Sequence, residues 1–224
     1  MNTSSNSKII KENTVFLLPH LLVLLVVGPI LMLTSKNELH LQITSFHHPV
    51  LDQFFKIITF AGDGAFPFIV GGILAFFSFR KAILVALGCS LAGLLAQFFK
   101  RAVFPDIKRP LGVFDQELLH LIPGVDLHTA YSFPSGHTTT VFSLAICLAI
   151  FSKNKTMKAL WLLFALVTGF SRVYLSQHFL VDVYFGSILG VVTMLIIFRP
   201  FQRLKWEWLN KSVITLFKTP QNNK

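Results

Sequence analysis

Residues 15–34 read VFLLPHLLVLLVVGPILMLT, a run without a single charged side chain. A helix needs about 20 mostly apolar residues to cross the hydrocarbon core of a bilayer, so this stretch predicts a membrane span. Lys8 and Lys11 precede it, as basic residues precede the apolar core of a secretory signal peptide. The run is too long for a signal peptide, however, and no small-residue cleavage site follows it. We therefore expect a retained first span.

The composition of the whole chain is that of an integral membrane protein. Of its 224 residues, 53% are hydrophobic and 13% are charged, whereas soluble domains carry about 25% charged residues. The two cysteines, Cys89 and Cys147, lie inside apolar runs without metal-ligand spacing and are expected to be small core residues. An amphipathic stretch covers residues 49–62. Further spans are predicted at residues 64–79, 82–99, 134–151, 157–174 and 179–198.

These runs predict an all-α polytopic membrane protein with six transmembrane helices and both termini in the cytoplasm. Residues 1–14 would be a cytoplasmic segment, 15–198 the membrane domain and 199–224 a basic cytoplasmic tail resting on anionic headgroups. In this orientation the inside segments hold thirteen of the 20 Lys and Arg residues and the outside segments seven, in accord with the positive-inside rule. A net charge of +10 suggests nucleic acid only where a soluble surface exists; no nucleic-acid partner is expected here.

Three polar segments stand at the predicted outer ends of the spans. Because hydropathy and loop charge set the topology independently of these motifs, their convergence on one membrane face is informative. The segments are Lys100-Arg101 with Lys108-Arg109-Pro110, then Pro134-Ser135-Gly136-His137, and then Ser171-Arg172 through His178 to Asp182.

Residue types in all three segments suit the binding of phosphate. Free backbone N–H groups and the helix dipole make the start of the fourth span an anion site. Gly136 would let the backbone approach the anion, and Ser135 would add a hydroxyl donor. Arg109 and Arg172 offer planar forks that match phosphate oxygens. A charged Arg172 at membrane depth needs a partner, which an anion would supply.

The third segment suits nucleophilic catalysis. His178 and Asp182 are four apart, which on a helix puts them on one face within hydrogen-bonding reach. A carboxylate on one imidazole nitrogen fixes the tautomer and leaves the other free to attack phosphorus. His137 is left as the general acid for the departing oxygen. Taken alone, a His-x3-Asp pair is usually a structural hydrogen bond, and Pro-Ser-Gly-His could be a loop and helix cap. Their combination favours phosphoryl transfer without a metal.

Together the segments resemble the signature of the type 2 phosphatidate phosphatase family, which is similar to class A bacterial acid phosphatases and vanadium haloperoxidases. That signature has a lysine before Arg-Pro, then Pro-Ser-Gly-His, then Ser-Arg-x5-His-x3-Asp, and the resemblance covers roughly residues 60–198. It implies a membrane lipid phosphatase acting through a phosphohistidine on His178, with Asp182 as its orienter and His137 as the acid. It also implies a phosphate site formed by Lys100, Arg109, Ser135, Gly136 and Arg172.

One spacing departs from the family pattern. The commonest spacing of six residues between Lys and Arg-Pro would put Ala102 in the place of the lysine. Here eight residues separate Lys100 from Arg109, and seven separate Arg101 from it. Lys100 is favoured, and Arg101 stays the alternative.

The resemblance leaves the substrate open among undecaprenyl pyrophosphate, phosphatidate, phosphatidylglycerol phosphate and lipid A phosphate. A lipid phosphotransferase of the same family is an alternative. A transporter or channel is disfavoured, because it would need ionisable or helix-breaking residues near the midplane, whereas the charges here gather at one face. The site should open outward, in a bacterium at the periplasmic face of the inner membrane. No cofactor, metal or obligatory protein partner is expected.

Polar residues outside these segments also carry expectations. Asp63, between two glycines, should form a turn or cap a helix. The loop at residues 111–130 could be a lid at the lipid surface. His20 should pack against a neighbouring helix. Surface positions are expected for His47, His48, His120 and His128.

Overall fold

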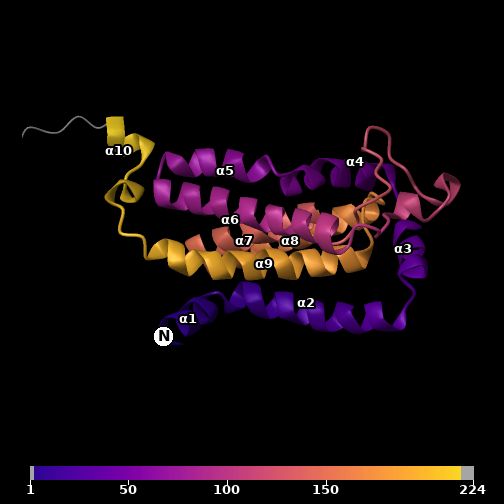
Figure 1. Ribbon diagram of the computed structural model, residues 1–224, viewed down its shortest axis with the longest axis horizontal. Helices are drawn as coiled ribbons and strands as arrows, with labels where there is room; N and C mark the ends of the chain where they lie inside the picture. The colour runs from indigo at the N-terminus through magenta and orange to yellow at the C-terminus, as the bar shows by residue number, and fades with distance from the viewer. Residues whose placement is uncertain (1–2, 218–224) are drawn as a thin grey trace, which may run out of the picture.

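The computed structural model of the protein describes residues 3–217. Within this range the chain forms helices and no strand, so the predicted all-α class is confirmed. Short helices connect or flank a bundle of long ones (Figure 1). The long helices are α2 (Thr14–Leu33), α6 (Phe79–Phe98), α7 (Gly136–Phe151), α8 (Lys155–Tyr174) and α9 (Leu180–Gln202). The short ones are α1 (Thr3–Glu12), α3 (Lys36–Thr44), α4 (Pro49–Ile58), α5 (Phe66–Ala75) and α10 (Val213–Phe217).

Four helices, namely α2, α6 with its continuation to Val103, α8 and α9, are long and apolar enough to cross a membrane. A fifth crossing is available if α4 and α5 act together, with the single-turn helix η1 (Thr59–Gly62) between them. These two parts meet at a bend of 62°. The protein is therefore an integral membrane protein, whereas the count of six spans stays a prediction.

The predicted second span at residues 64–79 is wrong in its extent. The helix there is only Phe66–Ala75, ten residues, and the last residue of the predicted run, Phe79, already belongs to α6. The additional length comes from the amphipathic stretch before α5. Two local signals divide the chain. Asp63 Oδ1 accepts from Ala65 N at 3.0 Å, the turn expected for this residue. Ser78 Oγ accepts from Lys81 N at 3.4 Å and so starts α6 inside the predicted run.

Helix α7 is the centre of the bundle and packs against α6, α8 and α9. Its sixteen residues span about 24 Å, less than the roughly 30 Å of hydrocarbon in a bilayer. Eleven of them are buried. Small residues let α9 approach closely, because a Cβ on Gly190 would collide with Thr139 O, and one on Gly186 would lie 2.8 Å from Ser135 O. This contact sets the start of α9 beside the start of α7.

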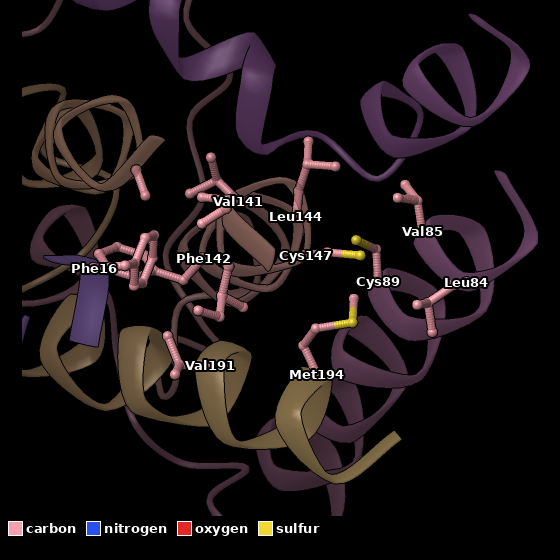
Figure 2. Packing of buried hydrophobic residues seen from close by; sticks show 14 of the residues in the cluster. Phe16, Leu84, Val85, Cys89, Val141, Phe142, Leu144, Cys147, Val191 and Met194 are labelled. Carbon is pink, nitrogen blue, oxygen red and sulfur yellow. The ribbon is translucent and has the colours of Figure 1, made fainter. Parts of the chain in front are cut away.

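The core beneath this contact is apolar and contains both cysteines. Cys89 of α6 and Cys147 of α7 are free and buried, as predicted. Figure 2 shows their sulfurs facing each other beside Met194 of α9. Helix α2 joins the bundle through His20, whose Nε2 lies 3.1 Å from Ser187 Oγ on α9. The prediction that His20 packs against a neighbouring helix is confirmed.

Both described ends of the chain lie at one end of the bundle, and the long connection between α6 and α7 lies at the other (Figure 1). Lys158 Nζ of α8 donates to Asn13 Oδ1 at 2.6 Å and so holds the end of α1. Arg80 Nη2 of α6 donates to Leu204 O at 2.9 Å and holds the tail. The end opposite these ties is called the loop end below.

Candidate active site

At the loop end, the polar segments of the sequence come together from five places in the chain. Each is brought there by the end of a helix or by the long connection. Lys100 lies on the π-turn Phe99–Val103 that ends α6, Arg109 and Ser132 on the connection, Ser135, Gly136 and His137 at the start of α7, Arg172 at the end of α8, and His178 and Asp182 around the start of α9.

His178 and Asp182 form the hydrogen bond expected from their spacing. His178 Nδ1 lies 3.2 Å from Asp182 Oδ2, and both side chains are 1% exposed. His178, however, precedes the helix, because α9 begins at Leu180. The expectation that both residues share one helical face is therefore wrong. The N–H groups of Gln177 and His178 both donate to Arg172 O, which closes a tight turn ahead of α9.

The carboxylate of Asp182 has two roles at this point. Its Oδ2 accepts from Phe179 N at 3.0 Å and so caps the first turn of α9. The same oxygen accepts from the hydroxyl of Ser132. The capping contact with Phe179 N thus fixes the Asp182 carboxylate, and the carboxylate in turn orients the His178 imidazole.

Burial lowers the pKa of His178 well below its usual value of 6.5, and the cations Lys100, Arg109 and Arg172 lower it further. The imidazole is therefore neutral at neutral pH. When Nδ1 of the neutral ring donates its proton to Asp182, the lone pair is on Nε2.

Lys100 and Arg101 point in different directions. Lys100 is 4% exposed, and its Nζ lies 4.0 Å from where a Cβ on Gly136 would be. Arg101 is exposed. A π-turn adds a residue to one helical turn and so changes the direction of the side chains on it. Lys100 lies on this turn and points into the site.

The two arginines are held by backbone carbonyls, by the amide oxygen of Gln177 and by one hydroxyl, with no carboxylate bonded to either guanidinium in the described chain. Arg109 Nε donates to Ala130 O at 3.0 Å and its Nη1 to Gln177 O at 3.3 Å. Arg172 is buried, and its Nη1 donates to Thr59 Oγ1 at 2.7 Å. The Nε of Arg172 has no partner among the described residues. Three inward-facing cations with so few acceptors form a site for an anion.

Ser135 caps α7, which is the structural role that Pro-Ser-Gly-His could have on its own. Its Oγ accepts from Thr138 N at 3.4 Å and from Thr138 Oγ1 at 2.9 Å. Because Ser135 Oγ is the acceptor in both hydrogen bonds, the hydrogen of the Ser135 hydroxyl is left for another partner. Ser135 N donates to Asp182 O at 3.0 Å, which joins the starts of α7 and α9.

A cavity of about 590 Å³ leads away from these residues. One end is polar and is lined by Lys100, Arg109, Gly136 and His137. The rest lies along α5 and α6 and is lined by largely apolar or small residues, among them Pro67, Phe68, Cys89, Gly93 and Leu94. His178 and Arg172 are buried and do not line it, but both lie within electrostatic reach of His137, which does.

The four histidines expected at the surface divide into three cases. His128 is exposed, as predicted. His48 is exposed, but its Nδ1 accepts from Val50 N and caps α4. The surface assignment is wrong for His120, which is partly buried, binds Asp52 at 3.0 Å and stacks on His47 with ring centres 3.9 Å apart.

Three residues near the site were not found from the sequence, namely Thr59, Ser132 and Gln177. None has a diagnostic spacing to the histidines, because each is brought to them by a bend or a loop. Among residues 3–217 no group of three or more His, Cys, Asp or Glu side chains could hold a metal ion.

The chain is similar to known lipid phosphatases in sequence and in fold. Residues 81–206 match the model of the PAP2 superfamily. Undecaprenyl-diphosphatase BcrC of Bacillus subtilis is 33% identical over 159 residues, which cover 69% of this chain and 77% of that protein. Lipid A 4'-phosphatase of Porphyromonas gingivalis is 27% identical over 195 residues, 81% of this chain and 79% of that one.

Two crystal structures share the fold. LpxE of Aquifex aeolicus superimposes with a TM-score of 0.64 at 28% identity, covering 72% of this chain and 93% of that one. A transmembrane PAP2-type phosphatidylglycerolphosphate phosphatase of Bacillus subtilis superimposes with a TM-score of 0.60 at 22% identity, covering 84% and 96%. The family model spans more than half of the 224 residues, and the protein therefore belongs to the PAP2 superfamily of type 2 phosphatidate phosphatases.

Proposed function

We propose that the protein removes a terminal phosphate from a membrane lipid through a phosphohistidine on His178. Membership of the PAP2 superfamily makes the chain a membrane lipid phosphatase. The observation that carries the mechanism is the neutral, buried His178 bonded to Asp182 and surrounded by Lys100, Arg109 and Arg172.

In the first step, the lone pair of His178 Nε2 attacks phosphorus and forms an N–P bond. The P–O bond to the lipid breaks, and His137, which is protonated while the negative phosphate is bound beside it, gives that proton to the departing oxygen. Lys100, Arg109, Arg172 and the first N–H groups of α7 hold the equatorial oxygens, on which charge accumulates.

In the second step, water attacks the phosphohistidine. His137, now without its proton, takes one from the water as the new O–P bond forms. The N–P bond breaks, its electron pair returns to His178 Nε2, and inorganic phosphate leaves. Asp182 stabilises the positive imidazole during both steps and neither gains nor loses a proton.

The shape of the cavity supports a lipid as the substrate. Its polar end can take a phosphate group, and its apolar length along α5 and α6 can take part of a hydrocarbon chain. The two curated relatives are named for phosphatases of undecaprenyl diphosphate and of lipid A. We propose a lipid phosphate of this class, taken from the outer leaflet of a bacterial inner membrane, with both termini of the chain in the cytoplasm.

The test uses the purified full-length protein and four lipids: undecaprenyl diphosphate, phosphatidate, phosphatidylglycerol phosphate and a lipid A phosphate. We expect inorganic phosphate from at least one of them and none from any with His178→Ala. A ³²P-labelled substrate should leave acid-labile label on the wild-type protein and none on this variant. Transfer of the label to a second lipid, rather than to water, would identify a phosphotransferase instead.

A second variant separates the acid from the nucleophile. His137→Ala should slow release of a lipid alcohol, a poor leaving group, more than release of an activated aryl alcohol, because only the poor one needs a proton. Substantial turnover by His178→Ala with either substrate would overturn the mechanism.

A further inference from the structure

We infer that Ser132 is a positioning residue for the nucleophile, so that the working unit is Ser132–Asp182–His178. This inference rests on the proposed role of His178. Ser132 precedes the Pro-Ser-Gly-His motif and belongs to none of the three polar segments. It is fully buried, and its Oγ lies within reach of both members of the histidine–aspartate pair.

The geometry fixes the direction of each hydrogen bond. An ionised Asp182 can only accept, so the single hydroxyl hydrogen of Ser132 goes to its Oδ2. The same hydroxyl lies 3.3 Å from His178 Nδ1. Since its hydrogen is already given to the carboxylate, the oxygen can only accept from that nitrogen.

Both neighbours of Nδ1 are therefore acceptors, Asp182 Oδ2 at 3.2 Å and Ser132 Oγ at 3.3 Å. The proton of the neutral imidazole must then be on Nδ1, and the lone pair on Nε2. Asp182 alone would favour this tautomer. Ser132 adds a second acceptor for the Nδ1 proton. Its own hydrogen is given to Asp182, so it does not donate to Nδ1, which would favour the other tautomer.

Ser132 also fixes the orientation of the Asp182 carboxylate. Asp182 Oδ2 takes the bonds from Ser132, Phe179 N and His178, while its Oδ1 has no hydrogen-bond partner among the described residues. Without the serine hydroxyl, only the backbone N–H and the histidine would orient the group. A rotation could then present either oxygen to Nδ1 and turn the imidazole away from phosphorus.

The serine is itself held in place by its backbone. Ser132 N donates to Ile107 O at 2.9 Å, which pairs the two ends of the α6–α7 connection. One end of this connection carries Arg109, and the other leads into α7. The loop that delivers the phosphate-binding arginine thus also delivers the hydroxyl that orients the nucleophile.

The test compares variants at position 132 with an activated aryl phosphate, for which His137 is not needed. Ser132→Ala should lower kcat by about 10- to 100-fold, the range for losing a hydrogen bond to a charged group, with little change in KM, because the serine does not touch phosphate. Ser132→Cys is nearly the same size but offers only a weak donor, so it should also lower kcat. Ser132→Thr keeps the hydroxyl and should recover most of the activity.

Two controls separate positioning from packing. Ser143→Ala removes another fully buried serine, on α7 and away from the pair, and should keep kcat within about twofold. In an Asp182→Asn background, Ser132→Ala should cost much less than in the wild type, because the charged acceptor is gone. Equal losses in both backgrounds, or a Ser132→Cys variant as active as the wild type, would overturn the inference. Activity in His178→Ala would instead overturn the proposed function beneath it.

Discussion

Asp182 Oδ2 lies 3.2 Å from His178 Nδ1, although only Asp182 belongs to helix α9. The same oxygen caps the helix through Phe179 N. The orientation of His178, the proposed nucleophile, is thereby coupled to the start of α9, which the packing of Gly186 and Gly190 holds against α7. Helix packing in the core and the geometry of the reacting group are parts of one arrangement.

The protonation state of His178 is the first prediction. Burial and three cations lower its pKa well below 6.5, so the ring stays neutral as the pH falls through that value. It gains a proton, and loses its nucleophilic lone pair, only at lower pH. We expect ¹⁵N NMR, assigned by comparison with His178→Ala, to show a ring that is still neutral at about pH 6 and that carries its proton on Nδ1 at neutral pH. A midpoint near the usual value, or a proton on Nε2, would contradict the prediction.

The phosphate contact at the end of α6 is the second. Lys100 is buried against the site, while Arg101 is exposed. Lys100→Ala should lower kcat/KM by about 100-fold or more, because a charged donor to the phosphate is lost, and Arg101→Ala should change it only a few-fold. Both variants need the same substrate and membrane environment. Equal losses, or a larger loss for Arg101→Ala, would assign the contact to Arg101.

The motifs that depend on local chemistry could be predicted from the sequence. Pro-Ser-Gly-His gave the capped start of α7, Asp63 gave a turn, and both cysteines are in the core. Apolar length alone could not show that the run at residues 64–79 is interrupted. The cap by Ser78 is one weak hydrogen bond, and the bend before α5 depends on how that helix packs.

The tertiary part of the site could not be predicted in the same way. The direction of Lys100 depends on a π-turn, a local change of helical phase that has no simple sequence signal. Ser132 and Thr59 reach the site by a loop and a bend, so that no fixed spacing relates them to His178. His120 has no partner nearby in sequence and finds Asp52, 68 residues earlier, only in the folded chain.

Independence from divalent metals is the third prediction. The arginines and the lysine can stabilise the charge on the equatorial oxygens, and the described residues contain no cluster suited to a metal. Turnover of a lipid phosphate should therefore be unchanged after prolonged treatment with EDTA and removal of the chelator. Loss of activity that Mg²⁺ restores would contradict the mechanism.

The orientation in the membrane is the fourth. Thirteen basic residues against seven favour cytoplasmic termini, which puts the loop end outside. An alkaline phosphatase reporter, active only outside the cytoplasm, should be active when it is inserted in the loop at residues 111–130. The same reporter fused to the C-terminal end of the chain should be silent. The reverse pattern would put the site in the cytoplasm.

The path of the lipid chain is the last. Gly93 lines the cavity, and a Cβ there would meet nothing closer than Thr140 Oγ1 at 3.9 Å. The Cβ of Gly93→Leu can therefore be placed without displacing the backbone, and the rest of the side chain would narrow the apolar part of the cavity. Gly72 on α5 is the matched control, because it is exposed, lies outside the cavity lining, and has nothing within 4 Å of an added Cβ.

Gly93→Leu should lower kcat/KM for a long-chain lipid phosphate by about tenfold or more, since a filled pocket excludes the chain. It should leave a short, water-soluble aryl phosphate almost unaffected, because the polar end by Lys100 and His137 stays open. Gly72→Leu should change neither. Equal losses with both substrates would mean that the leucine disturbs the phosphate site. If Gly93→Leu keeps full activity on the lipid, the chain lies elsewhere, and the cavity between α5 and α6 is not its path.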